Sequence, residues 1–303
     1  MKKKTKALIA LAVGIVTLST AAFASYTSSN GYDVLKKAVI DTFDTPNYTL
    51  KYDLTLKADG KVLDTESRDE QFDKASGALY IEDKGNNNSR HIECVIANEP
   101  YEYTSYMDIE DNKIKFHKFP IREEIGIRST LSLDKNDKTV AKYIRFAELF
   151  VDTFVGDLKN NFILTLQTDD EKTYQITLSS VQIPEIVNAG FGVIYANVME
   201  YIDEEHMTDE EKAVKQMGEN PTVKTASLKF VVDKNNKITD AKIVGVLEGN
   251  EHTMTLEVNA NLTDIGTTVP QEISEEDRKN AYDVSKDYAP MEVEYTEEVT
   301  EEE

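Results

Sequence analysis

Residues 48–73 read YTLKYDLTLKADGKVLDTESRDEQFD, and their alternation is the clearest structural signal in this 303-residue sequence. Large apolar side chains stand at every second position from Tyr48 to Leu56, with polar side chains between them. A period of two is typical of a β-strand with one dry face and one wet face. Asp59-Gly60 marks a hairpin turn, after which the chain returns in a second strand. The stretch therefore predicts an antiparallel hairpin.

The same alternation recurs along most of the chain. Turn-rich stretches separate the alternating segments, as in an antiparallel meander. The segments before and after the central helical region have the same character, so we expect them to belong to one sheet in one domain. The further predicted strands are residues 78–83, 90–98, 100–108, 112–119, 162–168, 173–180, 224–233, 238–249 and 252–266.

Helical spacing of apolar residues predicts three helices, at residues 31–43, 137–158 and 181–202. The third is apolar over more than half of its circumference, which indicates either burial on two sides or a position above a hydrophobic cavity. Gly190 and Gly192 within it each cost roughly 1 kcal/mol relative to alanine. They indicate a close approach of the backbone to a sheet, or a bend in the helix. The predicted fold class is α+β, with apolar helices packed on an antiparallel sheet.

Two shorter helical segments are expected further along the chain. Residues 207–221 predict a polar helical excursion or lid-like insertion that ends at Gly218 and Pro221. A second short helix is expected to start at Ser274, because acidic residues follow it directly.

The first 24 residues have the composition of a secretory signal peptide. Four lysines precede an apolar core from Ala7 to Thr20, and Ala22-Phe23-Ala24 fits the small-x-small cleavage pattern. We therefore expect an extracytoplasmic protein, cleaved before Ser25. The alternative is an uncleaved membrane anchor, because the apolar run approaches the ~18 residues that can span a bilayer. The remaining predicted boundaries are a polar linker at 25–30, the α+β domain at 31–270 and an acidic tail at 271–303.

The composition argues against several classes of function. A formal net charge of −22 repels the phosphates of nucleic acids and anionic lipid headgroups. Cys94 is the only cysteine, so the chain has no internal disulfide, and the alternation around it predicts a buried thiol. The four histidines are scattered outside zinc-ligand spacing, and the sequence contains no phosphate-binding or nucleophile motif. We therefore expect no metal, no cofactor and no enzymatic activity.

Four segments of the chain resemble one known family. They read FAELFVDTFVGDLKNNF (146–162), LSSVQIPEIVNAG (178–190), and FVVDKNNKITDAKIVGVLEG with HTMTLEVNANLTDIGTT (230–249 and 252–268). In this order they resemble the exported LolA-like proteins of Gram-positive bacteria, over residues 31–270. The resemblance implies a strongly curved, unclosed antiparallel sheet with helices on its concave face. It also implies that members with a ligand hold acyl chains there, whereas others act by protein contact.

The predicted binding site is an apolar cavity between the concave face of the sheet and the second and third helices. Sites for small ligands are usually concave and mostly apolar. We expect a non-catalytic carrier or sensor of a lipid or another acyl-chain ligand. The alternative is an envelope interaction or scaffold protein with a filled core, which docks another envelope protein through a sheet edge or its acidic surface. The candidate lining residues are Leu50, Tyr52, Leu54, Phe150, Phe154, Ile186, Phe191, Ile194, Tyr195 and Val198.

Overall fold

A computed structural model describes residues 30–86, 89–108, 112–121, 131, 163–183 and 207–286 of the chain, together with seven residues between 185 and 199. The predicted signal peptide, the predicted second helix and residues 287–303 lie outside the described residues. Within the third predicted helix, Val181 and Gln182 form part of a 3₁₀ turn and Ile183 is not helical, whereas the seven described residues that follow are α-helical, which confirms a helix there. These residues are Glu185, Asn188, Ala189, Gly192, Tyr195, Ala196 and Met199.

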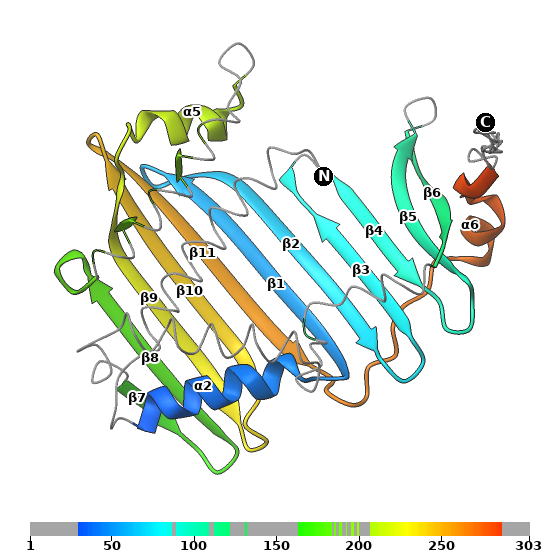
Figure 1. Cartoon of the computed structure of the whole chain (residues 1–303), viewed down its shortest axis with the longest axis horizontal. Helices are drawn as coiled ribbons and strands as arrows, with labels where there is room; N and C mark the ends of the chain where they lie inside the picture. Colours follow the sequence, from blue (N-terminus) through cyan, green and yellow to red (C-terminus); the bar gives the residue numbers. More distant parts are fainter. Residues whose placement is uncertain are drawn as a thin grey trace, which may run out of the picture.

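The described strands form one twelve-stranded sheet that curls without closing (Figure 1). Their order in space is β12-β6-β5-β4-β3-β2-β1-β11-β10-β9-β8-β7. All neighbours are antiparallel except β12, which runs parallel to β6. The strands are β1 (Asn47–Ala58), β2 (Lys61–Asp73), β3 (Ala78–Lys84), β4 (Arg90–Val95), β5 (Tyr101–Asp108), β6 (Lys113–Pro120), β7 (Ile163–Gln167), β8 (Glu171–Ser179), β9 (Thr222–Asp233), β10 (Ile238–Gly249), β11 (His252–Thr263) and β12 (Tyr282–Asp283).

The predicted α+β class is wrong, because β-structure dominates the fold. The complete α-helices among the described residues are α2 (Asn30–Phe43), α5 (Asp209–Gln216) and α6 (Glu275–Asn280). Two single 3₁₀ turns also occur, η3 (Ser180–Gln182) and η4 (Val284–Lys286). Five strands are 12 or 13 residues long, and each pairs with two neighbours over most of its length. The sheet is therefore the main element of the fold, and the described helices pack on it individually.

The hairpin predicted from residues 48–73 is confirmed. β1 pairs with β2 from Asn47 opposite Asp73 to Ala58 opposite Lys61. Both turn residues have positive φ, +47° at Asp59 and +78° at Gly60. This is the backbone that a two-residue turn needs to match the twist of the strands, and it explains the Asp-Gly pair. On its other side β1 pairs with β11 over ten positions.

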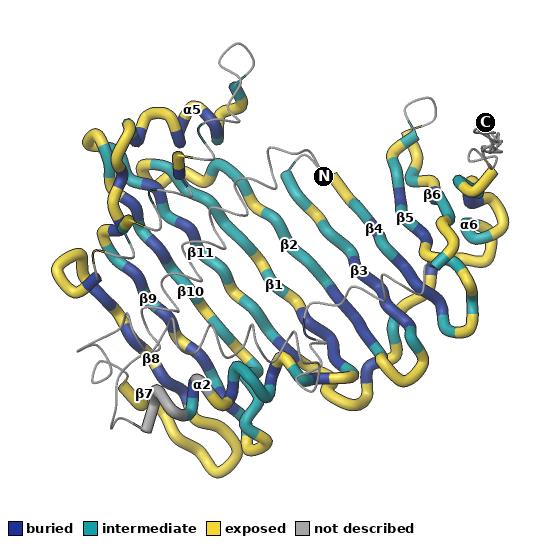
Figure 2. The backbone as a smooth tube through the Cα atoms, in the orientation of Figure 1, coloured by how far each residue is buried: buried dark blue, intermediate teal, exposed yellow. Residues whose placement is uncertain are grey.

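One face of the sheet carries α2 and the described helical residue Tyr195, and we call it the inner face. Its buried side chains form two apolar clusters, which Figure 2 shows as buried segments of the strands. The first cluster lies over β8–β10, where Leu35 and Ala38 of α2 pack with sheet residues such as Phe230. The second lies over β1–β3 and contains Tyr48, Leu50, Phe72, Leu79, Ile81, Val95, Leu131 and Leu262.

The opposite face, the outer face, has an apolar cluster of its own over β3–β6. Ile273 and Ala281, which flank α6, are buried there against residues such as Cys94. The predicted helix start at Ser274 is confirmed, because its side chain accepts a hydrogen bond from Asp277 N. Residues 271–286, part of the stretch predicted as an acidic tail, thus belong to the folded structure. The predicted buried thiol is confirmed, and burial raises the pKa of the Cys94 thiol to about 11.

Candidate functional site

The centre of the inner face is lined by apolar residues that are only partly buried. Two rows of residues cross the strands there, because residues paired directly in an antiparallel sheet share a face. One row runs from Leu228 on β9 to Leu54 on β1, and the next runs from Phe230 to Tyr52. The β9 ends of both rows are buried, whereas the six residues on β10, β11 and β1 have intermediate exposure. We call these six the central floor: Ala241, Ile243, Val258, Ala260, Tyr52 and Leu54.

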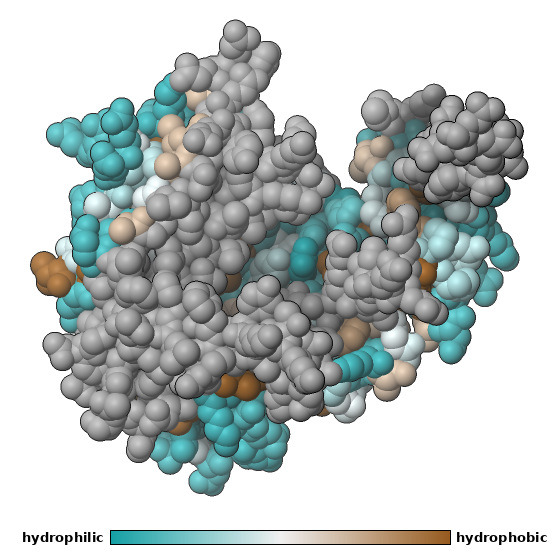
Figure 3. All heavy atoms as spheres, viewed as in Figure 1, coloured by the Kyte–Doolittle hydropathy of each residue, from teal (hydrophilic) through white to brown (hydrophobic). Residues whose placement is uncertain are grey.

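Beyond β1, the same two rows become charged. Leu54 pairs with Glu66 of β2 and Tyr52 pairs with Arg68, so both charged side chains lie beside the central floor. The row of Arg68 continues to Asp83 on β3. The space-filling view shows a hollow in the middle of this side of the molecule, with hydrophilic and hydrophobic residues visible inside it (Figure 3). The charged stripe, as we call this group, consists of Asp64, Glu66, Arg68, Glu70 and Asp83.

Arg68 links most of the charged stripe. Its guanidinium donates to both oxygens of Asp83, with Nε–Oδ1 at 2.6 Å and Nη2–Oδ2 at 2.9 Å. Its Nη1 lies 3.9 Å from Glu70 Oε2, and its Cζ lies 5.7 Å from the ring centre of Tyr52. Glu70 is fully buried and accepts a 2.5 Å hydrogen bond from the Tyr48 hydroxyl. Burial works to lower the pKa of Arg68, but the bonds and charges of Asp83 and its neighbours outweigh it and raise that pKa.

Glu66 lies beside the central floor as the direct partner of Leu54. It forms no hydrogen bond or ion pair with the part of the chain that the structure describes. Burial is the main cause that raises the pKa of its carboxyl to about 7. Repulsion by Asp64 and Asp83 raises this pKa further, whereas the positive charge of Arg68 lowers it. The stripe has four acids and one arginine, so it would accept a polar or cationic group of a ligand better than an anionic one.

Replacing Glu66 by glutamine is expected to stabilise the protein at pH 8 and to change little at pH 4. The folded protein keeps this proton until pH about 7, whereas the unfolded chain loses it near pH 4.5. Between these two pH values the folded state binds more protons than the unfolded chain. The free energy of unfolding of the wild-type protein therefore falls as pH rises from 4.5 to about 7, and it falls no further on account of Glu66 above pH 7. Because the side chain is partly exposed, we expect a gain of about 1 kcal/mol at pH 8. Urea unfolding at both pH values measures it, and an equal effect at both would contradict the raised pKa.

Tyr195 connects the third predicted helix to α5. Its side chain is buried, and its hydroxyl lies 2.8 Å from the carbonyl oxygen of Val214 and 2.7 Å from that of Gly218. The predicted helix at 207–221 is confirmed as α5, and Val214 and Met217 are buried in the first inner cluster. α5 is therefore a part of the core as well as a polar surface helix.

The surroundings explain the absence of a side chain at one glycine of this region but not at another. An added Cβ at Gly192 would meet no atom within 4 Å, so a close approach to the sheet does not explain it. Gly190 lies outside the described residues. At Gly249 of β10 an added Cβ would lie 2.3 Å from the carbonyl oxygen of Met217. The residue that follows α5 can therefore pack against this position only if the position holds a glycine.

Four of the ten predicted lining residues are described. Tyr52 and Leu54 belong to the central floor, Leu50 is buried in the second inner cluster, and Tyr195 is buried in the first. The charged stripe was not predicted from the sequence. The remaining predicted lining residues lie outside the described residues and stay predictions: Phe150, Phe154, Ile186, Phe191, Ile194 and Val198.

Neither metal ligands nor membrane spans were found among the described residues. No group of three or more His, Cys, Asp or Glu side chains within this part of the chain is arranged to hold a metal ion. None of the helices described is long and apolar enough to cross a membrane. What the described inner face does offer is an apolar floor beside a charged stripe.

Comparison with known proteins gives distant similarities of fold alone. No family model matches the chain, and no curated protein matches it. A LolA superfamily protein from Nitrosomonas europaea is 8% identical, with 82% of this chain and 97% of that chain covered and a TM-score of 0.21. A β-barrel-like protein of a domain of unknown function from Brucella abortus is 10% identical, with 73% and 99% covered and a TM-score of 0.20. Values this low carry no conclusion about family or function.

Proposed function

We propose that this protein is an exported, non-catalytic binding protein that carries or senses a hydrophobic ligand with an acyl chain. The observation that carries the proposal is the partial exposure of the central floor, in the middle of a face whose two ends are closed by buried clusters. Apolar side chains gain free energy when they are removed from water, so a floor of this kind favours an apolar occupant.

The charged stripe supports a more specific form of this ligand. An acyl chain that lies along the row from Ile243 to Leu54 would bring its polar end to Glu66 and Arg68 on β2. A polar group buried beside an apolar floor needs hydrogen-bond partners, and Glu66 and Arg68 provide an acceptor and a donor. The proposed ligand is therefore an amphiphile with a polar head that is neutral or positively charged.

Organic extraction of the purified protein is the direct test. We expect mass spectrometry of the extract to detect a lipid in stoichiometric amount, and the emptied protein to take up a fluorescent fatty-acid amide or fatty amine. An extract without lipid, together with no saturable uptake of either probe, would contradict the proposal.

Replacing Leu54 by glutamate is expected to weaken uptake of the fluorescent probe at least ten-fold, about 1.4 kcal/mol or more. The substitution places a charge in the central floor, where an acyl chain could not solvate it. Thr55→Glu is the matched control, because the adjacent residue points to the outer face of the same strand and is also partly buried. It should leave the dissociation constant within about two-fold, a change of less than 0.5 kcal/mol. Equal losses in both variants would point to a general effect of the added charge.

One observation favours the alternative, an envelope interaction protein. β7 is the last strand of the sheet order, and its apolar residues Ile163, Leu164 and Leu166 are 63%, 45% and 60% exposed. Exposed apolar edge strands are typical sites for the addition of a strand from another chain. If no ligand is found by extraction or by uptake, Leu166→Lys tests this alternative: it should abolish association with a partner protein and leave the melting temperature unchanged.

A further inference from the structure

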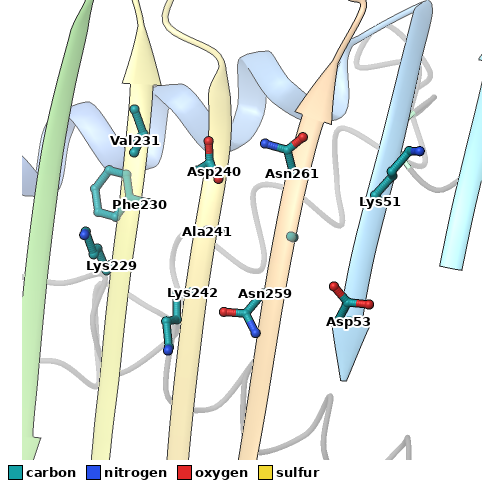
Figure 4. Close-up of a pocket in the computed structure, with 11 residues that line it drawn as sticks. Lys51, Asp53, Lys229, Phe230, Val231, Asp240, Ala241, Lys242, Asn259 and Asn261 are labelled. Atoms are coloured by element: carbon teal, nitrogen blue, oxygen red, sulfur yellow. The ribbon is translucent and has the colours of Figure 1, made fainter. Parts of the chain in front are cut away.

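A pocket of about 340 Å³ lies on the outer face of the sheet, away from the central floor. Figure 4 shows its side chains on β1, β9, β10 and β11, with α2 on the far side of the strands. The pocket volume lies in the range of small-ligand sites. Its polar lining contrasts with the inner face. The lining side chains with charges or amides are Lys51, Asp53, Lys229, Asp240, Lys242, Asn259 and Asn261.

The register of the strands places two lysines side by side in this pocket. Lys229 of β9 is the direct cross-strand partner of Lys242 of β10, and Lys242 in turn pairs with Asn259 of β11. Asn259 pairs with Asp53 of β1, so one row across four strands begins with two cations and ends with an amide and an acid (Figure 4). Neither lysine forms an ion pair or a hydrogen bond with the described residues.

This arrangement is unexpected in a chain with 56 acidic and 34 basic residues. Three other lysines of the outer face do have acidic partners: Lys51–Asp69 at 3.0 Å, Lys57–Glu257 at 2.6 Å and Lys224–Glu248 at 2.8 Å. Like charges directly opposite each other in a sheet are destabilising. The facing pair of Lys229 and Lys242 therefore lowers stability, and unfavourable pairs of this kind are expected mainly at functional sites.

We propose that Lys229 and Lys242 bind an oxyanion, the phosphate or carboxylate group of a small hydroxylated ligand. Two ammonium groups offer several hydrogen-bond donors and the positive charge that an oxyanion needs. The amide of Asn259 adds a donor beside Lys242, and it offers hydroxyl groups both a donor and an acceptor. Asp53 lies at the far end of the row, where it accepts from hydroxyl groups without facing the anion. This site is separate from the inner face, and it does not depend on the function proposed above.

Titration of the isotope-labelled protein with inorganic phosphate, followed by the amide NMR signals of β9 and β10, tests the proposal. We expect saturable shifts at Lys229, Lys242 and Asn259, and a dissociation constant that increases with ionic strength. Glucose 1-phosphate and glucuronate distinguish a phosphate from a carboxylate source, and glucose is the neutral control. Saturable binding of either anion, with no binding of glucose, supports the site. The absence of saturable shifts with all three anions up to about 20 mM, a binding free energy weaker than about 2.3 kcal/mol, would overturn it.

The double variant Lys229→Gln, Lys242→Gln should weaken anion binding at least ten-fold. Lys224→Gln is the matched control, since this lysine is exposed on the same strand but is paired with Glu248 outside the pocket. It should change the dissociation constant less than two-fold. A loss in the control as large as that in the double variant would mean general charge attraction and would overturn the proposal. In the absence of anions, Lys242→Gln alone should raise the melting temperature by about 1 °C, because it removes the repulsion between the lysines.

Discussion

Arg68→Met is expected to lower the free energy of unfolding by about 3 kcal/mol, one of the largest effects of any charge substitution in this protein. The variant would leave Glu70, which is fully buried, and Asp83, which is 23% exposed, without their common cation. Removal of one partner from a buried ion pair is costly because the other charge stays in a medium that solvates it poorly. Urea unfolding at pH 7 measures the effect.

The control for this variant is Lys51→Met on the neighbouring strand. Lys51 also pairs with a carboxylate, Asp69, but on the outer face with its side chain 59% exposed. Exposed pairs of this kind contribute about 0–1 kcal/mol. We further expect Arg68→Lys to be intermediate, since lysine keeps the charge but cannot donate to both oxygens of Asp83 in the same fork geometry. Equal effects of Arg68→Met and Lys51→Met would show that the charged stripe is solvated like the surface.

Tyr195→Ala is expected to destabilise the protein by about 4 kcal/mol, comparable to other large-to-small substitutions at buried aromatic residues. The ring is 2% exposed in the first inner cluster, and its hydroxyl contacts the end of α5. Tyr195→Phe should cost only about 1 kcal/mol, since it keeps the packing and removes one hydrogen bond. Thermal and urea unfolding of both variants separate the two contributions.

The Tyr195 variants also report on the link between the helix and α5. Tyr282→Ala serves as a control for the loss of a tyrosine, because this side chain is 48% exposed at the edge of the sheet. We expect it to change the unfolding free energy by less than about 1 kcal/mol. If Tyr195→Ala behaved like this control, the helix would not be anchored through Tyr195.

Local patterns in the sequence were sufficient to predict most of the strands. The Asp59-Gly60 turn, the alternation from Tyr48 to Leu56 and the Ser274 cap are each encoded by a few neighbouring residues with a definite backbone preference. The fold class was wrong for a different reason. Three helical patterns suggested a balanced α+β fold, but the length of the strands and their assembly into one sheet depend on pairing between distant segments. β1 and β11 are neighbours although some 200 residues separate them, and a pattern within either strand does not predict which strand pairs with it.

The charged stripe was missed because β2 is polar on both faces. In residues 64–71 every position except Thr65 and Ser67 is a charged residue or an amide, so alternation could not show which face is covered. The register with β1 resolves this, because Leu54 and Tyr52 place Glu66 and Arg68 on the inner face. Tyr52 and Leu54 could be predicted as inner-face residues, since their own strand has a clear apolar face. Their partial exposure depends on what packs above them, and it could not be read from the strand.

The position of β1 in the sheet has a consequence for the newly made chain. β1 is the first strand of the described part of the chain, and β2 to β6 can add to one side of it in order. Its other side must remain open until β11 has been made, because those ten positions have no other partner in the finished sheet. An open edge of this length invites pairing with other chains during folding. Protection from aggregation is therefore needed in the interval before β11 has been made.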